Sequence, residues 1–183
     1  MKPDVSETPE LSVWRAISTK RAVREFSARP LDPDHLDRIL RAGRRSGSSK
    51  NLQRWEFVLC RDREHLGELS AVGPYAGHLA GAAVAIALVT PKSAEADDPL
   101  SVMFDLGQAA AYMMLAAWEL GIGSVPATVY EPDLARRLLG YPSSHHCEYL
   151  LSFGYPADET VLTAPNRRGR RRPLEEMVHD ERW

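Results

Sequence analysis

The spacing of hydrophobic residues along the chain predicts five helices. Asp32 and Asp62 have side chains that favour a helix N-cap, and Pro33 suits a first helical position. Glycines at positions 121 and 140 are expected to close two of the other helices. The helices are expected at residues 11–18, from 32–33 to Gly43 or Gly47, at 62–69, at 100–120, and from 131–132 to 140.

Extended segments lie between these helices. Trp55 to Cys60, Ala82 to Thr90 and Tyr149 to Phe153 predict strands, and Ser124 to Tyr130 predicts a short extended piece. The run from Ala82 to Thr90 is almost unbroken in its apolar character, which is typical of a strand buried on both faces. Helices that alternate with a few strands predict a layered α/β or α+β domain, and the pattern leaves the strand order open.

The helix expected at residues 100–120 has almost no polar face. A helix that is apolar nearly all round is either central to its own domain or buried between two subunits. The sequence leaves both possibilities open.

The composition indicates one ordinary compact domain, because the chain has 183 residues, of which 44% are hydrophobic and 26% charged. The net charge of −2 does not point to a nucleic-acid or membrane partner. Residues 1–10 lack the features of a signal peptide, and the apolar strand segments are too short to span a bilayer. We therefore expect a cytoplasmic protein with a flexible segment at 1–10 and an extended C-terminal arm at 157–183.

Motif searches exclude several kinds of site. The two cysteines, Cys60 and Cys147, have neither metal-binding nor dithiol spacing, so no metal site is expected. The motifs of serine hydrolases, zinc proteases and Walker phosphate loops do not occur in the sequence. The glycine pair at 121 and 123 follows a helix rather than a strand, which argues against a Rossmann dinucleotide site.

Four segments are richer in polar and basic residues than a structural role requires, and two of them lie in the first third of the chain. Residues 20–26 (KRAVREF) would place Lys20 and Arg24 on one face of an extended chain, where they could bind a phosphate and a polar ring edge. Residues 47–55 (GSSKNLQRW) are dense in short hydrogen-bonding side chains that suit a heteroaromatic ring edge. A charged surface strand and an ordinary loop are the structural alternatives.

The other two segments follow the long helix. Residues 121–130 (GIGSVPATVY) contain glycines and a proline that fix the backbone and can aim an N–H group at a reactive atom. Residues 170–176 (RRRPLEE) carry arginines suited to bidentate phosphate binding. A helix C-cap with a turn and a solvated basic tail are the structural alternatives.

Taken together and in this order, the four segments resemble the FMN-dependent nitroreductase family. KRAVREF is similar to that family's R-R-S-x-R-x-F motif, and SSKNLQRW is similar to its S-S-x-N-x-Q-P-W loop. Residues 121–126 are similar to its G-[IVL]-x-x-x-P segment, and residues 171–176 to its R-[RK]-P-L-E-E tail. The resemblance spans residues 11–183 and implies an α+β, three-layer α/β/α sandwich with a mostly antiparallel central sheet, assembled as an intertwined homodimer.

The resemblance also implies FMN as the cofactor and NADH or NADPH as the electron donor. Lys20 and Arg21 would meet the phosphate and ribityl chain, and Arg24 would reach the pyrimidine edge of the ring. The backbone of residues 126–129 would approach flavin N5, and Arg171 with Arg172 would close on the phosphate.

The partner subunit's loop is implied to supply Ser48, Ser49 and Asn51 to the same flavin. All implied cofactor-binding residues are Lys20, Arg21, Ala22, Arg24, Ser48, Ser49, Asn51, Gln53, Pro126, Ala127, Thr128, Arg171 and Arg172.

Three positions depart from the family pattern and bear on flavin affinity. Lys20 stands where the family usually has arginine, and Ala22 removes a hydroxyl from the implied phosphate site. Arg54 replaces the proline that usually precedes Trp55, which adds a charge to the loop.

The implied reaction passes hydride from NAD(P)H through the flavin to a small oxidised acceptor, such as a nitroaromatic or a quinone, by a ping-pong scheme. Because the cofactor performs this chemistry, no side chain is expected to act as a nucleophile or general base. The alternatives are a non-catalytic flavin binder or sensor, another flavin reaction of the same family, and nucleic-acid binding by the arginine tail. The near-neutral net charge argues against the last of these.

Overall fold

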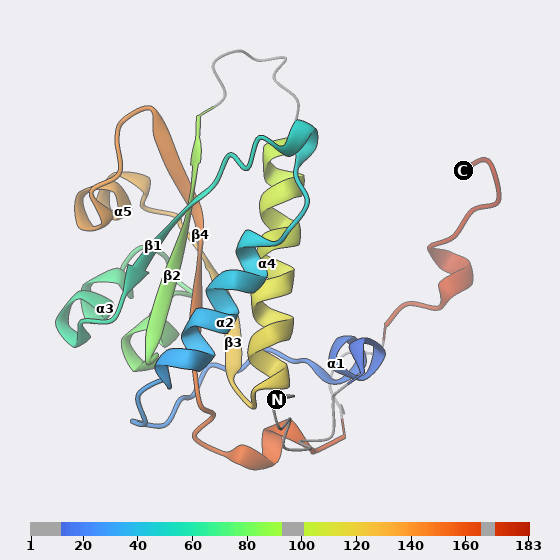
Figure 1. Cartoon of the computed structure of the whole chain (residues 1–183), viewed down its shortest axis with the longest axis horizontal. Helices are drawn as coiled ribbons and strands as arrows, with labels where there is room; N and C mark the ends of the chain where they lie inside the picture. The colour runs from blue at the N-terminus through green and yellow to red at the C-terminus, as the bar shows by residue number, and fades with distance from the viewer. Residues whose placement is uncertain (1–11, 93–100, 166–170) are drawn as a thin grey trace, which may run out of the picture.

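The computed structural model describes residues 12–92, 101–165 and 171–183. Its centre is a four-stranded sheet in the order β1-β2-β4-β3, in which every neighbouring pair is antiparallel (Figure 1). The strands are β1 (Glu56–Cys60), β2 (Val84–Pro91), β3 (Gly123–Thr128) and β4 (His145–Gly154).

Helices cover both faces of this sheet. They are α1 (Val13–Thr19), α2 (Pro33–Arg44), α3 (Arg63–Leu69), α4 (Ser101–Glu119) and α5 (Pro132–Leu139). Figure 1 shows α2 and α4 together on one side of the strands and α3 and α5 on the other. The prediction of an α+β, three-layer sandwich with an antiparallel central sheet is confirmed.

Each face of the sheet has its own hydrophobic core. On one face, Ile39 of α2 and Met113 of α4 pack with Ile86 of β2. On the other face, Leu66 of α3 packs with Ala87 of β2. Because successive residues of β2 point to opposite faces and both faces are covered, the strand is apolar except at buried Thr90, as its sequence indicates.

The helix limits follow the expected capping chemistry. The Asp32 side chain accepts a hydrogen bond from the backbone N–H of Asp34, and the Asp62 side chain accepts one from that of His65. Gly140 ends α5 in the left-handed conformation with a φ of 71°. The predicted helix starts at Leu11 and Leu100 lie outside the described residues.

One helix ends within its predicted limits, and one strand is longer than the sequence pattern predicts. Helix α2 ends at Arg44, between the two predicted ends, and Met113 of α4 packs so closely on Gly43 that a Cβ there would lie 2.6 Å from its Cε. Strand β4 begins at His145 rather than Tyr149, because backbone pairing with β2 extends over polar residues that hide the apolar pattern.

The chain passes the edge of β3 before it enters α2. A parallel bridge joins Ala22 to Ser124, and the Val23 N–H donates a hydrogen bond of 3.2 Å to the Ser124 carbonyl. Gly123 permits this close approach, since a Cβ on it would lie within 2.8 Å of three Val23 side-chain atoms. Residues 20–24 therefore run along β3 as an additional extended segment.

The C-terminal region has two described parts. Residues 157–165 lie against the body of the domain, where the Ala157 N–H donates a 3.0 Å hydrogen bond to the Glu25 carbonyl. Residues 171–183 project away from the body and are exposed throughout (Figure 1). Of the arm expected at 157–183, only this last part is extended away from the domain.

The described residues contain no helix long and apolar enough to cross a membrane. Within the same residues, no group of three histidine, cysteine or acidic side chains is arranged to hold a metal ion. Both cysteines are buried, and burial raises the pKa of Cys60 to about 11 and that of Cys147 to about 12. Their thiols are core groups, as expected for Cys60 from its apolar neighbours.

Candidate flavin site

The first predicted segment leads from α1 to the edge of β3 and carries its cations in different directions. Lys20 is half-buried, and its Nζ lies 3.5 Å from Sδ of Met114 on α4. Burial lowers the pKa of the Lys20 ammonium. Arg21 turns toward residues 157–165, where its Nη2 donates a 2.5 Å hydrogen bond to the Ala164 carbonyl.

Arg24 lies on the other side of the same segment and is exposed. It forms no hydrogen bond or ion pair with another described residue, so its guanidinium is available to a ligand. Its positive charge lowers the pKa of His78, which places the two side chains in one electrostatic environment. Lys20 thus approaches β3 from the α4 side, and Arg24 approaches it from the side of His78.

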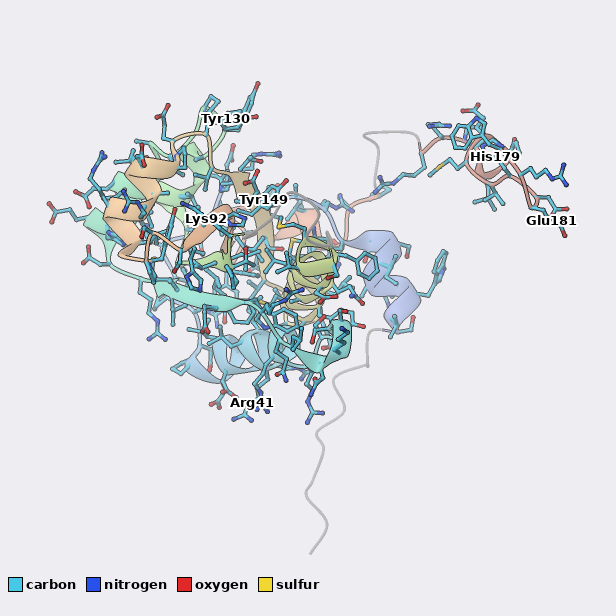
Figure 2. All side chains as sticks on the ribbon, turned by 90° about the horizontal axis from the view of Figure 1, so that it is seen from above. Arg41, Lys92, Tyr130, Tyr149, His179 and Glu181 are labelled. Carbon is cyan, nitrogen blue, oxygen red and sulfur yellow. The ribbon has the colours of Figure 1, made fainter. Side chains whose placement is uncertain are left out.

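An apolar hollow opens between α4 and the strands beside Met114. Its volume is about 240 Å³. Its lining is almost entirely aliphatic or thioether and consists of Leu88, Met103, Leu106, Gly107, Ala110, Met114, Pro126, Tyr149 and Leu151. In Figure 2, Tyr149 lies within the body of the domain, whereas Arg41 projects outward from the surface of α2. The hollow reaches the third predicted segment at Pro126, which is exposed next to buried Ala127 and half-buried Thr128.

His78 is a polar residue of this region that sequence reasoning missed. Its Nδ1 lies 2.9 Å from the Ser152 Oγ, which itself donates a hydrogen bond of 3.1 Å to the Val125 carbonyl. Which of these two groups donates depends on the ring nitrogen that carries the imidazole proton. Nε2 is buried and has no hydrogen-bond partner among the described residues. A single histidine in a short connecting segment gives no sequence pattern that marks this role.

His78 predicts an acid-sensitive step in stability. Burial and the charge of Arg24 lower its pKa below the usual 6.5, against the weaker opposing effect of the Pro126 carbonyl. The unfolded chain therefore binds more protons at this site, and stability is lost as the pH falls below about 6.5 toward the lower folded pKa. The Tm of the wild type should fall more between pH 7 and pH 5 than the Tm of His78→Gln. Parallel pH profiles for the two proteins would contradict the assignment.

The second predicted segment is a tightly wound loop with exposed polar side chains. Lys50, Asn51 and Gln53 have positive φ values of 52°, 56° and 49°. Each left-handed non-glycine residue costs on the order of 1 kcal/mol, with asparagine the best tolerated. The Gln53 N–H donates a 3.0 Å hydrogen bond to the Ser48 Oγ, which closes the loop. Ser49, Asn51 and Gln53 are exposed.

This loop and the Lys20–Arg24 segment lie at different ends of α4 in one protomer. The loop contacts the helix at Asp105, whereas Lys20 contacts it at Met114. These helix positions are nine residues apart, which corresponds to about 14 Å along the axis. One protomer alone therefore does not bring Ser48, Ser49, Asn51 or Gln53 to the edge of β3.

The C-terminal arginines are also distant from that edge in the single chain. Arg171 is exposed, and Arg172 is engaged within the arm, where its Nη2 donates a 2.6 Å hydrogen bond to the Glu176 carbonyl. Figure 2 shows His179 and Glu181 on this arm, well separated from the body. Of the four predicted segments, the protomer joins the first and third, at Ala22 and Val23 on one side and Ser124 on the other.

The chemistry of this edge fits a flavin nucleotide. Lys20, Arg21 and Arg24 supply cations on one short segment, which suits a phosphate and the electron-rich edge of a ring. The adjoining hollow supplies the apolar surface that an aromatic ring requires, and it ends at the backbone of Pro126. Ala22 contributes no hydroxyl, and Arg21 would have to exchange its bond to Ala164 for one to a ligand.

Comparison with known proteins supports the same interpretation. The family model described as "Nitroreductase family" matches residues 17–72 and 68–155. A protein of Archaeoglobus fulgidus with the provisional name NADH dehydrogenase/NAD(P)H nitroreductase is 32% identical over 174 residues, covering 92% of this chain and 97% of its own length. A Thermus thermophilus protein named NADH dehydrogenase is 26% identical, covering 93% of this chain and 96% of its own.

A solved structure leads to the same family. It is named an FMN-dependent nitroreductase of Clostridium difficile, shares 25% identity, and covers 92% of this chain and 98% of its own, with a TM-score of 0.77. The sequence motifs, the layered fold and these matches agree over most of the chain. The chain therefore belongs to the nitroreductase family of oxidoreductases.

Proposed function

We propose that the protein binds FMN at the edge of β3 and passes hydride from NADH or NADPH to a small oxidised acceptor. The observation that carries this proposal is the bridge between Ala22 and Ser124, which holds the segment with three cations against β3, and Lys20 of that segment contacts Met114 in the lining of the apolar hollow. The FMN dependence named for the C. difficile structure supports the choice of flavin.

In this proposal the chain's own residues bind and orient the nucleotide. Lys20 and Arg21 hold the phosphate and ribityl end, and Arg24 donates hydrogen bonds to the pyrimidine edge. The backbone of Pro126, Ala127 and Thr128 would line the side of the site that receives the reactive part of the ring. A cation at the pyrimidine edge stabilises negative charge there, which favours the reduced form of the cofactor.

Bound FMN would supply the hydride chemistry, accepting two electrons from the nicotinamide and giving them to a nitroaromatic, a quinone or a similar acceptor. No side chain of this chain is assigned as a nucleophile or general base. Donor and acceptor would use the same apolar slot in turn, which is a ping-pong scheme.

The proposed active form is a homodimer. It would bring Ser48, Ser49, Asn51 and Gln53 to the flavin bound by the other protomer, together with the arm that bears Arg171 and Arg172. Large apolar side chains that the single chain leaves exposed support this assembly: Val13, Trp14, Ile17, Phe104, Tyr112, Leu174, Met177, Val178 and Trp183. Exposed apolar surface of this extent is typical of a surface that another chain covers.

The α1–α4 side of the protomer also has an apolar hollow of about 520 Å³. Tyr112, Leu115 and Ala116 of α4 line it together with Val13 of α1. The nearly all-apolar sequence of α4 is thus only partly explained by packing within the protomer, and burial between two protomers would account for the rest.

The test is an absorbance spectrum of the purified protein after incubation with FMN and removal of the excess. A bound flavin spectrum, bleached by anaerobic NADH or NADPH and restored by a nitroaromatic or quinone, is the expected result. Size-exclusion chromatography with light scattering should give twice the monomer mass. A colourless protein would refute flavin binding, and a yellow protein that neither donor bleaches would indicate a non-catalytic flavin binder.

A further inference from the structure

Asp105 is a buried carboxylate in an otherwise apolar helix, and neither the motifs nor the proposed chemistry accounts for it. It lies in the second turn of α4 and is only 6% exposed. Its Oδ2 accepts a 2.9 Å hydrogen bond from the backbone N–H of Ser49. A buried polar group is stable only when it is hydrogen-bonded, and among the described residues the Ser49 N–H is the group bonded to Asp105.

A second polar contact joins the same loop to the same face of α4. Arg54 is half-buried, and its Nη2 donates a 3.2 Å hydrogen bond to the Ser101 Oγ. Ser101 and Asp105 are four residues apart, so they lie one above the other on the helix. The two ends of the loop, at Ser49 and Arg54, are therefore both attached to the first turns of α4.

The loop between these attachments is held in a conformation that its sequence does not favour. Lys50, Asn51 and Gln53 all have positive φ values. Left-handed non-glycine residues persist only where the surrounding structure fixes them. The bond from Ser49 to Asp105 is the attachment that comes directly before the first of them. Removing it would let the loop adopt other, less strained conformations.

We propose that Asp105 is a positioning residue for the flavin loop: it holds Ser48–Gln53 in the one conformation that presents Ser49 and Asn51 to the FMN of the partner protomer. This inference rests on the proposed function. Asp105 does not touch the cofactor, because it is buried beneath the loop. Loss of Asp105 would lower the fraction of protein molecules whose loop is in the binding conformation. The apparent Kd for FMN would rise in inverse proportion to that fraction.

The experiment compares FMN affinity, measured by quenching of flavin fluorescence, in three dimeric variants. Asp105→Ala removes the acceptor and should raise the Kd by about tenfold or more, since hydrogen bonds to charged groups are among the stronger ones. Asp105→Asn keeps an oxygen acceptor for the Ser49 N–H and should stay within about threefold of the wild type. Leu66→Ala is the control, because it also destabilises the fold but acts from the opposite face of the sheet.

A second pair of variants tests the same bond from its other side, should Asp105→Ala fail to fold. Ser49→Pro removes the donor N–H, and the extended ψ of 151° at Ser48 is compatible with a following proline. Ser49→Ala loses only the hydroxyl and keeps the N–H. The proline variant should bind FMN about tenfold more weakly than the alanine variant.

The outcomes separate this inference from the proposed function. If the wild type binds FMN and Asp105→Ala binds it as well as Leu66→Ala does, the positioning role is wrong while the flavin site stands. Loss of affinity in Asp105→Asn equal to that in Asp105→Ala would also overturn it, because charge rather than the bond would then matter. If the wild type itself does not bind FMN, the proposed function has failed. At saturating FMN, kcat of Asp105→Ala should return to near the wild-type value, as a residue away from the reacting atoms requires.

Discussion

Arg24→Ala is expected to raise the Kd for FMN by about 10- to 100-fold and to slow reduction of the bound flavin by NADH or NADPH. Arg24 is exposed beside β3, and its guanidinium has no partner among the described residues. It is therefore available to donate hydrogen bonds to the ring, and these bonds strengthen when the reduced ring carries negative charge. Flavin fluorescence titration gives the affinity, and anaerobic stopped-flow absorbance gives the reduction rate.

Two further variants identify the property of Arg24 that matters. Arg24→Lys keeps the charge but loses the planar fork, so it should recover part of the affinity and not all of it. Arg61→Ala removes an exposed arginine that directly follows β1, at the opposite edge of the sheet, and should behave as the wild type. Normal flavin binding and turnover in Arg24→Ala would show that this residue is not part of the site.

His78, whose pKa is lowered by the charge of Arg24, gives an independent check on this geometry. If Arg24 lies where its charge lowers the pKa of His78, then Arg24→Ala should raise that pKa. The variant would then lose less stability than the wild type when the pH falls below about 6.5. NMR titration of the His78 ring gives this shift without any bound cofactor.

The layers of the fold follow from the sequence because they depend on local patterns. Asp32 and Asp62 predict where helices begin, and the apolar run from Ala82 to Thr90 predicts a strand buried on both faces. The order β1-β2-β4-β3 does not follow, since it depends on which strands pair across long stretches of chain. Strand β4 was underestimated for the same reason, because its first residues are held by backbone pairing with β2 rather than by apolar side chains.

The sequence likewise predicts some parts of the candidate site and not others. The segments at 20–26 and 121–130 meet at Ala22 and Ser124 in one protomer, and their contact depends on Gly123, which no local pattern marks. His78 and Asp105 were missed because each is a single polar residue whose role depends on a distant partner, Ser152 for one and Ser49 for the other. The roles of the loop at 48–53 and of Arg171 and Arg172 stay predictions, as do the homodimer and the cytoplasmic location.

Gly123→Ala is expected to lower Tm by about 5 °C and to weaken FMN binding at the same time. A Cβ at this position would lie 2.6 Å from Cβ, 2.7 Å from Cγ1 and 2.8 Å from Cγ2 of Val23. Val23 cannot simply move aside, because its N–H is bonded to the Ser124 carbonyl at 3.2 Å and its neighbour Ala22 forms the bridge to β3. The added methyl group would therefore push the whole segment, with Lys20 and Arg24, away from β3.

Calorimetry and flavin titration on the same samples test this coupling between packing and binding. Gly67→Ala is the matched control, because an added Cβ there meets no atom within 4 Å and should leave Tm unchanged or slightly raised. In the Gly123→Ala background, Val23→Ala removes two of the three close contacts and should recover part of both losses. If Gly123→Ala lowered Tm but left the Kd for FMN unchanged, the segment beside β3 would be a structural strand and the cations on it would not bind the cofactor. Loss of both properties, with joint partial recovery, is the result that a shared packing and binding role requires.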